Sequence, residues 1–337
     1  MNRAHGRSAS TAGEAVIAVD GGASKTDAAL IGMDGALLNQ VRGPGSNPQL
    51  LGWREAAARL TELRYRLVVE APPHTVLRTH LYLAGLDLPH EIAAAEKALS
   101  SWEADVIEND IFALLHAGTR SAPAIAIICG TGMNAVGVTA SGHVIRYPAL
   151  GAISGDWGGG DGLGRAALWH AARAIDGRGP ATSLTIALPR VFGLQHITQL
   201  VDSLHLGRLN EGAFSRLTPA LFAEAEAGDS VAAAVVDRQA EEIALIARAT
   251  LQSMAVEVGE DVPLVLGGGV VAAGSRRLTR QIADRVAQLA PAAVIQVVDA
   301  PPVLGAGVAA LTAAGAGDDA IDRFRALAST ERSPASV

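Results

Sequence analysis

The chain has 337 residues, about twice the length of a typical domain, so we expect two domains with separate cores. Hydrophobic residues make up 49% and charged residues 18% of the sequence, a balance typical of a packed α/β protein and unlike a disordered chain. The net charge is −7 and no cluster of Lys and Arg forms a stripe, which argues against nucleic acid or an anionic membrane as a partner.

Cysteine and histidine usage excludes further classes of site. Cys129 is the single cysteine, so internal disulfides and Cys-rich zinc or iron–sulfur sites within one chain are excluded, and the 9 histidines lack close metal-ligand spacing. Residues 1–14 predict a disordered tail and not a signal peptide, and residues 328–337 predict a second disordered tail. No uncharged apolar run reaches membrane-spanning length, so we expect a cytoplasmic protein.

A hairpin with strands over residues 16–19 and 28–31 is the first predicted element. Glycines at its tip can take positive φ and let backbone N–H groups converge on an anion, while hydroxyl and ammonium groups add donors. A carboxylate beside a phosphate makes sense if Mg²⁺ lies between them. An ordinary hairpin turn explains these residues equally well. The tip reads Asp20-Gly21-Gly22-Ala23-Ser24-Lys25-Thr26.

Three polar residues follow in loops of the first half. Asn47 lies in a Gly/Pro-rich loop over residues 43–48 and offers an amide that can donate and accept, although a solvated Asn-Pro turn is the simpler interpretation. Asp87 follows a predicted strand over residues 80–86. Asp110 lies between a short strand and a helix, where open α/β sheets place their ligands, and catalysis and helix capping are equally good interpretations of it. The other elements predicted in this half are a strand over 36–41, helices over 52–70, 89–99 and 111–117, and a strand over 105–108.

The hairpin pattern returns over residues 124–138, with Gly130-Thr131-Gly132 at its tip. Two such hairpins about 110 residues apart predict two similarly built domains. A glycine-dense stretch over 148–164 contains Asp156, and we expect it to approach a ligand, with a flexible linker as the alternative. The triple glycine Gly267-Gly268-Gly269 permits close approach of a nucleotide or only tight packing. The remaining predicted elements are a strand over 143–147, helices over 163–175, 182–226 and 230–258, a strand over 263–266, a helix over 276–289, a strand over 295–298 and a helix over 304–314.

Taken in order, these motifs resemble the sugar kinase/actin/heat-shock-70 superfamily of ATPases. Within it they are similar to the BadF/BadG/BcrA/BcrD-type ATPases and the N-acetylglucosamine kinases that share their domain. The resemblance covers most of residues 16–314. It implies an α/β fold of two ribonuclease H-like (actin-like ATPase) domains with an interdomain cleft for nucleotide and sugar. The implied domains are residues 15–118, joined by a C-terminal helix over 304–325, and residues 119–303.

The resemblance also implies roles for individual residues. ATP would be held by two phosphate motifs and an adenosine motif, which correspond to Gly21, Gly22, Ser24, Lys25 and Thr26, to Gly130, Thr131 and Gly132, and to Gly267, Gly268 and Gly269. Asp20 would hold Mg²⁺, mostly through water, and Asp110 would act as general base. The implied sugar contacts are Asn47, Asp87, Asp110, Met133, Asn134, Leu150, Gly151 and Asp156.

Departures from the family pattern lie beside the implied sugar pocket. The common Gly-Asp-Glu-Gly-Ser of the family reads Gly155-Asp156-Trp157-Gly158-Gly159 here, Ala149-Leu150-Gly151 stands where Gly-Trp-Gly is frequent, and Met133 replaces a usual serine. These changes concern the identity of the sugar more than the type of reaction.

The implied activity is transfer of the ATP γ-phosphoryl group to the 6-hydroxyl of an amino sugar, N-acetylglucosamine or glucosamine. Another hexose or N-acetylmuramic acid is an alternative acceptor. An activator ATPase of the BadF type is disfavoured because its iron–sulfur cluster needs more cysteines than two subunits would supply. A non-catalytic sugar sensor is disfavoured because both phosphate hairpins and Asp110 are intact. Relatives in the family imply a homodimer.

Overall fold

The structure is a computed structural model that describes residues 13–210, 212–256 and 260–330. Its contacts divide the chain into two compact units, which are residues 1–117 with 300–337 (unit 1) and residues 118–299 (unit 2). Most of the predicted tails, residues 1–12 and 331–337, lie outside the described residues. Gly13 and Glu14 already belong to the first strand, and the last helix extends to Thr330, so both tail predictions were too long at their inner ends.

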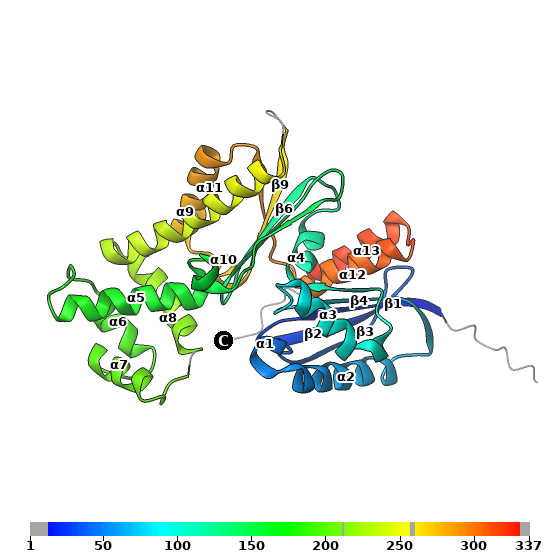
Figure 1. The fold of residues 1–337 in the computed structure, drawn as a ribbon, viewed down its shortest axis with the longest axis horizontal. Coiled ribbons are helices and arrows are strands. Elements are labelled where there is room, and N and C mark those ends of the chain that lie inside the picture. The colour runs from blue at the N-terminus through cyan, green and yellow to red at the C-terminus, as the bar shows by residue number, and fades with distance from the viewer. Residues whose placement is uncertain (1–12, 211, 257–259, 331–337) are drawn as a thin grey trace, which may run out of the picture. The chain divides into compact units, whose positions relative to one another are not determined.

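Unit 1 is built on a five-stranded sheet in the order β3-β2-β1-β4-β5 (Figure 1). The antiparallel part is a meander of β1, β2 and β3, and β4 and β5 then add in parallel to β1. The bounds of these strands are β1 Gly13–Gly21, β2 Lys25–Gly32, β3 Leu37–Pro44, β4 His74–Leu83 and β5 Val106–Asn109. The helices of this unit are α1 Pro48–Leu51, α2 Trp53–Val69, α3 Pro89–Ala98, α4 Ile111–Gly118, α12 Pro302–Ala313 and α13 Asp318–Thr330.

Strand β1 is buried on both faces, which explains its uninterrupted run of small apolar residues. Because side chains alternate along a strand, Ile17 and Val19 face a core that includes Leu60 of α2. The neighbouring strand β2 contributes Ile31 to the opposite face, where it lies close to Gly307 of α12. The sheet therefore has α2 on one side and α12 with α13 on the other (Figure 1). The single helix predicted over 304–325 is in fact two helices with a break at Ala314–Gly317.

Unit 2 repeats the same topology with the strand order β10-β9-β6-β7-β8. Its strands are β6 Ala124–Cys129, β7 Met133–Val138, β8 Val144–Arg146, β9 Val262–Gly267 and β10 Ala293–Val297. Again an antiparallel meander of three strands is extended by two parallel strands. The prediction of two similarly built α/β domains is confirmed.

The helices of unit 2 form a larger core than the sheet alone could provide. Long α9 packs on β6 and β7 and against α11, and α5 packs against α8 (Figure 1). The helices are α5 Gly159–Ile175, α6 Leu184–Arg190, α7 Ile197–His205, α8 Ala213–Glu226, α9 Ser230–Ser253, α10 Gly269–Ala272 and α11 Arg276–Leu289. In the described part of the chain, no helix combines the length and the apolar character needed to cross a bilayer.

Several predicted element ends were wrong, and glycine or proline is usually the reason. Helix α5 starts at Gly159 and not at residue 163. Its glycines lie where a side chain would collide with a neighbour: a Cβ on Gly159 would meet the backbone of Gly132, and one on Gly164 would meet the backbone of Phe214. Strand β3 extends to Pro44 and Pro48 opens α1, so the predicted 43–48 loop is shorter than expected. Helix α9 ends at Ser253, before the predicted end at 258.

Candidate active site

The turn between β1 and β2 carries the first predicted phosphate motif. It is tied down by backbone hydrogen bonds, since the Gly22 N–H donates to the Lys25 carbonyl at 2.9 Å and the Gly22 carbonyl accepts from the Ser46 N–H at 3.0 Å. Gly21 has no room for a side chain, because a Cβ there would meet Leu83 and the Ser46 hydroxyl. Ser24 is exposed at the tip. The turn is thus a fixed backbone loop with one predicted hydroxyl donor open to solvent.

Asp20 ends up almost fully buried at the base of this turn, with 7% of its surface exposed. The pKa of its carboxyl is raised to about 8, mainly by burial and in part by the negative charges of Asp110 and Asp27. Lys25 acts in the opposite direction. The structure therefore brings Asp20 and Asp110, the predicted metal ligand and the predicted base, into electrostatic contact.

This environment fits a divalent cation. Two neighbouring carboxylates in a poorly hydrated place repel each other unless a positive charge offsets them. Among the described residues no group of three or more His, Cys, Asp or Glu side chains could enclose a metal ion. The site suits a cation such as Mg²⁺, which keeps several waters and takes other ligands from substrate phosphates.

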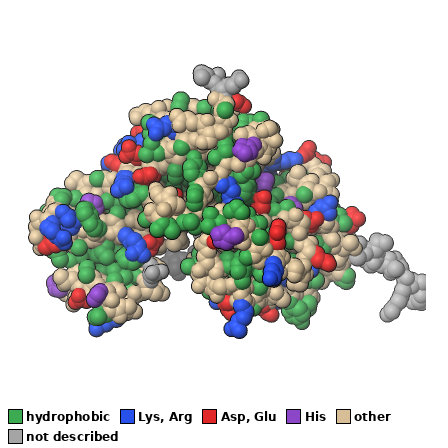
Figure 2. All heavy atoms as spheres, viewed as in Figure 1, with side chains coloured by type: hydrophobic (Ala, Val, Ile, Leu, Met, Phe, Trp, Pro, Cys, Tyr) green, Lys and Arg blue, Asp and Glu red, His purple; other side chains and the backbone are tan. Residues whose placement is uncertain are grey.

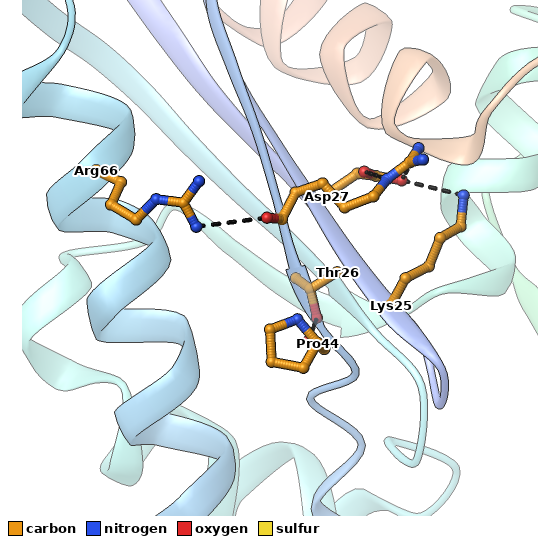
Figure 3. A network of polar contacts seen from close by, with 6 residues as sticks. Lys25, Thr26, Asp27, Pro44 and Arg66 are labelled. Carbon is orange, nitrogen blue, oxygen red and sulfur yellow. Dashed lines mark hydrogen bonds and ion pairs between the residues drawn. The ribbon is translucent and has the colours of Figure 1, made fainter.

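Lys25 and Thr26 have structural partners within unit 1. The Lys25 ammonium lies 3.1 Å from Asp27, whose side chain is completely buried and also binds Arg42. The Thr26 hydroxyl lies 3.0 Å from the Pro44 carbonyl, to which it can donate, and Figure 3 shows both interactions. The Thr26 hydroxyl thus links strand β2 to β3, whereas the Lys25 ion pair lies within β2. The contact of both side chains with phosphate stays a prediction.

A second group of predicted residues gathers at the carboxyl ends of β4 and β5. Asp87 accepts a hydrogen bond from the Asn109 amide at 2.9 Å and another from Gln49 at 3.2 Å. Gly85 has φ +80°, and a Cβ on it would collide with the Asn47 side chain. Asn47 and Asp87 therefore lie in one neighbourhood, close to the strand end that carries Asp110.

Capping roles are divided between two asparagines. The Asn47 side-chain oxygen accepts the Gln49 N–H at 2.8 Å and caps α1, and its contact with a sugar stays a prediction. The Asn109 side-chain oxygen accepts the N–H of Ile111, the first residue of α4, at 3.0 Å. Asn109 thus caps the N-terminal end of α4, and Asp110 and Ile111 follow it directly in the chain.

In unit 2 all three predicted glycine motifs converge on one turn. The Gly130 carbonyl accepts the Gly160 N–H at 2.7 Å, and the Thr131 carbonyl accepts the Asp161 N–H at 2.9 Å, so the first turn of α5 lies on the 130–132 turn. A Cβ on Gly159 would lie 2.6 Å from the Gly132 carbonyl carbon. Gly268, with φ +96°, approaches the other side, where a Cβ would lie 2.5 Å from the Cys129 carbonyl. Backbone alone fits at these contacts.

Two cavities flank this turn, and Thr131 lines both. The larger, of about 880 Å³, also has Met133, Gly151 and Asp156 in its wall. The smaller, of about 220 Å³, is lined by Gly130, Gly269 and residues of α8. Of the sugar contacts predicted in unit 2, Asn134 and Leu150 are not among the described residues that line the larger cavity.

Asp156 shapes the loop that borders the larger cavity. Its carboxylate accepts the Gly151 N–H at 3.0 Å and the Ser154 hydroxyl at 2.7 Å. The same Ser154 hydroxyl lies 2.8 Å from the Leu150 N–H, whose hydrogen bond it accepts. Asp156 and Leu150 thus belong to one closed loop, in which one carboxylate oxygen fixes the backbone.

Gln239 of α9 was missed by the sequence analysis. Its fully buried amide accepts the Gly159 N–H at 2.9 Å and donates to the Met133 sulfur at 3.5 Å. A Cβ on Gly158 would collide with it. Gln239 therefore connects the start of α5 to a predicted sugar contact, and nothing in its sequence surroundings marks it.

Helix α8 also carries residues that were missed, in a region predicted to be helical without further function. Ser215, Thr218 and Phe222 line the smaller cavity, and the Thr218 hydroxyl donates to the Gly160 carbonyl at 2.8 Å. The Ser215 hydroxyl is buried and has no hydrogen-bond partner among the described residues. Their spacing of three and four residues puts them on one helix face, a signal that was present in the sequence.

The comparison with known families decides the classification. Residues 17–311 match the sequence model of the BadF/BadG/BcrA/BcrD ATPase family. The chain belongs to this family. The resemblance expected from the motifs is confirmed.

Relatives of the chain include two curated kinases and a solved structure. It is 27% identical over 319 residues to an N-acetyl-D-glucosamine kinase of Dictyostelium discoideum, covering 88% of this chain and 98% of the relative. It is 26% identical over 266 residues to an N-acetylmuramic acid/N-acetylglucosamine kinase of Clostridium acetobutylicum, covering 76% and 85%. The crystal structure of a candidate N-acetylglucosamine kinase from Chromobacterium violaceum superposes with a TM-score of 0.67 at 22% identity, covering 87% of this chain and 97% of that one, so the two proteins share a fold.

Proposed function

We propose that this protein is an ATP-dependent kinase that phosphorylates the 6-hydroxyl of an amino sugar, N-acetylglucosamine or glucosamine. One observation carries the proposal: the Gly130–Gly132 turn has a cavity on either side, one beside the Gly269 backbone and one beside Asp156. A phosphate held at such a turn can have its nucleoside on one side and its acceptor on the other. The two curated kinases among the relatives support the same reaction.

The nucleoside belongs in the smaller cavity. Gly269, Val270 and Phe222 all line it, so a flat base would meet apolar surface and backbone. The Ser215 hydroxyl offers a donor and acceptor that has no other partner in the described structure. A polar group of the nucleoside would satisfy this hydroxyl, whose isolation otherwise costs free energy.

Asp110 is the group proposed to accept the proton of the sugar hydroxyl. The sugar oxygen attacks the γ-phosphorus, the bond from that phosphorus to the bridging oxygen of ADP breaks, and the hydroxyl proton passes to the Asp110 carboxylate. General-base help of this kind contributes on the order of 10²–10⁴-fold. The rest of the rate depends on positioning, because phosphoryl transfer needs little covalent chemistry from the protein.

Asp20 is proposed to hold Mg²⁺, mostly through water. Its carboxylate lies close enough to Asp110 for the two negative charges to repel each other, and a divalent cation would offset this repulsion. A bound cation would supply neutralisation of phosphate charge. The exposed Ser24 hydroxyl and the backbone of the first turn, with Lys25 and Thr26 behind it, are the proposed phosphate contacts of unit 1.

The other proposals concern the state of the protein. The family resemblance supports a homodimer in the cytoplasm. The rival role as an iron–sulfur activator is disfavoured, because Cys129 is fully buried in strand β6, where it cannot reach a cluster shared with another subunit.

Substitution of the proposed base tests the reaction. In a coupled ATPase assay over N-acetylglucosamine, glucosamine, N-acetylmuramic acid and glucose, the wild type should show its highest kcat/KM with one of the first two. Asp110→Asn should reduce that value by at least 10²-fold while ATP still binds in a calorimetric titration. Wild-type turnover by the variant would show that Asp110 is not the base, and ATP hydrolysis that no sugar stimulates would refute the kinase.

A further inference from the structure

The larger cavity of unit 2 extends well beyond the predicted sugar contacts. Its volume of about 880 Å³ is near the top of the range of roughly 300–1,000 Å³ that holds drug-sized ligands. A single pyranose ring is much smaller than such a ligand. The cavity therefore has room for more than one sugar ring.

Two tryptophans form the wall of this additional space. Trp157 follows Asp156 in the loop and Trp169 lies on α5, and both line the cavity together with Ala166, Ala234 and Val235. Trp169 is 55% exposed, so its indole ring is accessible to a ligand in this cavity. Figure 2 shows hydrophobic side chains gathered over the part of unit 2 that contains α5 and α8.

Arginine side chains hold both indole rings in place. The Arg238 guanidinium lies 4.1 Å from the centroid of the Trp157 ring, and the Arg173 guanidinium lies 4.5 Å from that of Trp169. Such contacts orient the rings before a ligand arrives. Stacking on a ring that is already fixed costs less conformational entropy than ordering a mobile one.

The charges of the cavity favour a neutral substituent. Arg165 lines it, but its guanidinium is 2.6 Å from the Asp161 carboxylate. Asp156 adds a further negative charge, and Arg238 has Glu242 at 3.7 Å. Carboxylates thus offset the charges of these arginines, so we expect the indole faces to contribute more to ligand binding than the charged groups do.

We propose that this cavity takes an amino sugar whose anomeric oxygen carries a second, uncharged ring, which stacks on Trp157 and Trp169. The anomeric oxygen is the position through which amino sugars are joined to further rings, and it leaves the 6-hydroxyl available for phosphorylation. The C–H face of a second sugar and the face of an aryl group both suit an indole. The inference rests on the kinase activity proposed above and assigns its substrate class.

A matched pair of substrates tests it: the methyl and the phenyl β-glycoside of N-acetylglucosamine. The wild type should use the phenyl glycoside with a kcat/KM roughly three- to tenfold higher than the methyl glycoside, the usual gain from one aromatic contact. Trp169→Ala should bring this ratio close to one. Tyr65→Ala is the control, since Tyr65 is an equally exposed aromatic residue (62%) on α2 of unit 1, and its ratio should stay that of the wild type.

The outcomes separate this inference from the kinase assignment. If N-acetylglucosamine is phosphorylated and the wild type uses both glycosides equally, the ring subsite is refuted and the kinase stands. If no sugar is phosphorylated, the kinase is refuted, and a titration of intrinsic tryptophan fluorescence with the two glycosides still decides the subsite. Tighter binding of the phenyl glycoside, lost in Trp169→Ala, supports the subsite, and equal binding overturns it.

Discussion

Asp20→Asn should make the protein more stable and less active. In the folded state the pKa of Asp20 rises to about 8 from a reference value of 3.8, mainly because the carboxyl is buried. Between these two values the folded state holds a proton that the unfolded state releases, so stability falls as pH rises through this window. Asparagine has no charge to bury and should remove this slope.

The size of the effect follows from the same two values. At about 1.4 kcal/mol per pH unit between 3.8 and the working pH, the carboxyl costs about 2 kcal/mol at pH 5 and up to about 4 kcal/mol at pH 7. Urea unfolding of wild type and Asp20→Asn in the presence of a chelator, at pH 5, 7 and 8.5, measures it. The stability gain of the variant should grow from pH 5 to pH 7 and change little above pH 8.

Addition of Mg²⁺ provides the second half of the experiment. Metal should stabilise the wild type and not the variant, because a ligand of the folded state shifts unfolding by mass action. Asp322→Asn, which changes an exposed carboxylate of the same unit, is the control. Its free energy of unfolding should depend on pH and on Mg²⁺ as that of the wild type does. If the free energies of unfolding of wild type and Asp20→Asn change with pH in parallel, the burial argument is refuted.

Two further predictions concern the packing of unit 1. Burial, with His80 and Arg325 nearby, lowers the pKa of His116 to about 4, so the free energy of unfolding should fall as pH drops from about 6.5 to 4. His116→Gln should therefore move the midpoint of acid unfolding to lower pH, and an unchanged midpoint would contradict this. A Cβ on Gly305 of α12 would meet the backbone of Ala113 and Ala117 of α4, so Gly305→Ala should cost about 1–3 kcal/mol in urea unfolding. Gly52→Ala is not a suitable control because of its φ of +75°, whereas Gly317→Ala, with open space around it, should have little effect.

Local sequence patterns predicted the sheets well because both hairpins have strong signals. In β1 the apolar run from Ala15 to Val19 is buried on both faces, and such a run followed by Asp-Gly-Gly has few other interpretations. The same holds for β6 and the turn at Gly130. A buried apolar run that ends in turn residues therefore suffices to predict a hairpin, whereas the order of the parallel strands β4, β5, β9 and β10 was not predicted.

Long-range contacts explain what the sequence could not show. Gly159 starts α5 because it fits against Gly132, a partner 27 positions away in the chain that no local propensity reveals. Gln239 is identified only through its hydrogen bond to Gly159, a residue 80 positions away in the chain. Helix α8 is different, since its cavity-lining face could have been recognised from spacing alone.

Thr131 has a consequence for how ligands act on one another. Because it lines both cavities of unit 2, a molecule that shifts this residue in one cavity alters the wall of the other. Each ligand then changes the affinity of the other by the same factor, because the coupling free energy between two binding sites is reciprocal. The coupling free energy between the two cavities can therefore be measured by titrating either ligand in the presence and absence of the other.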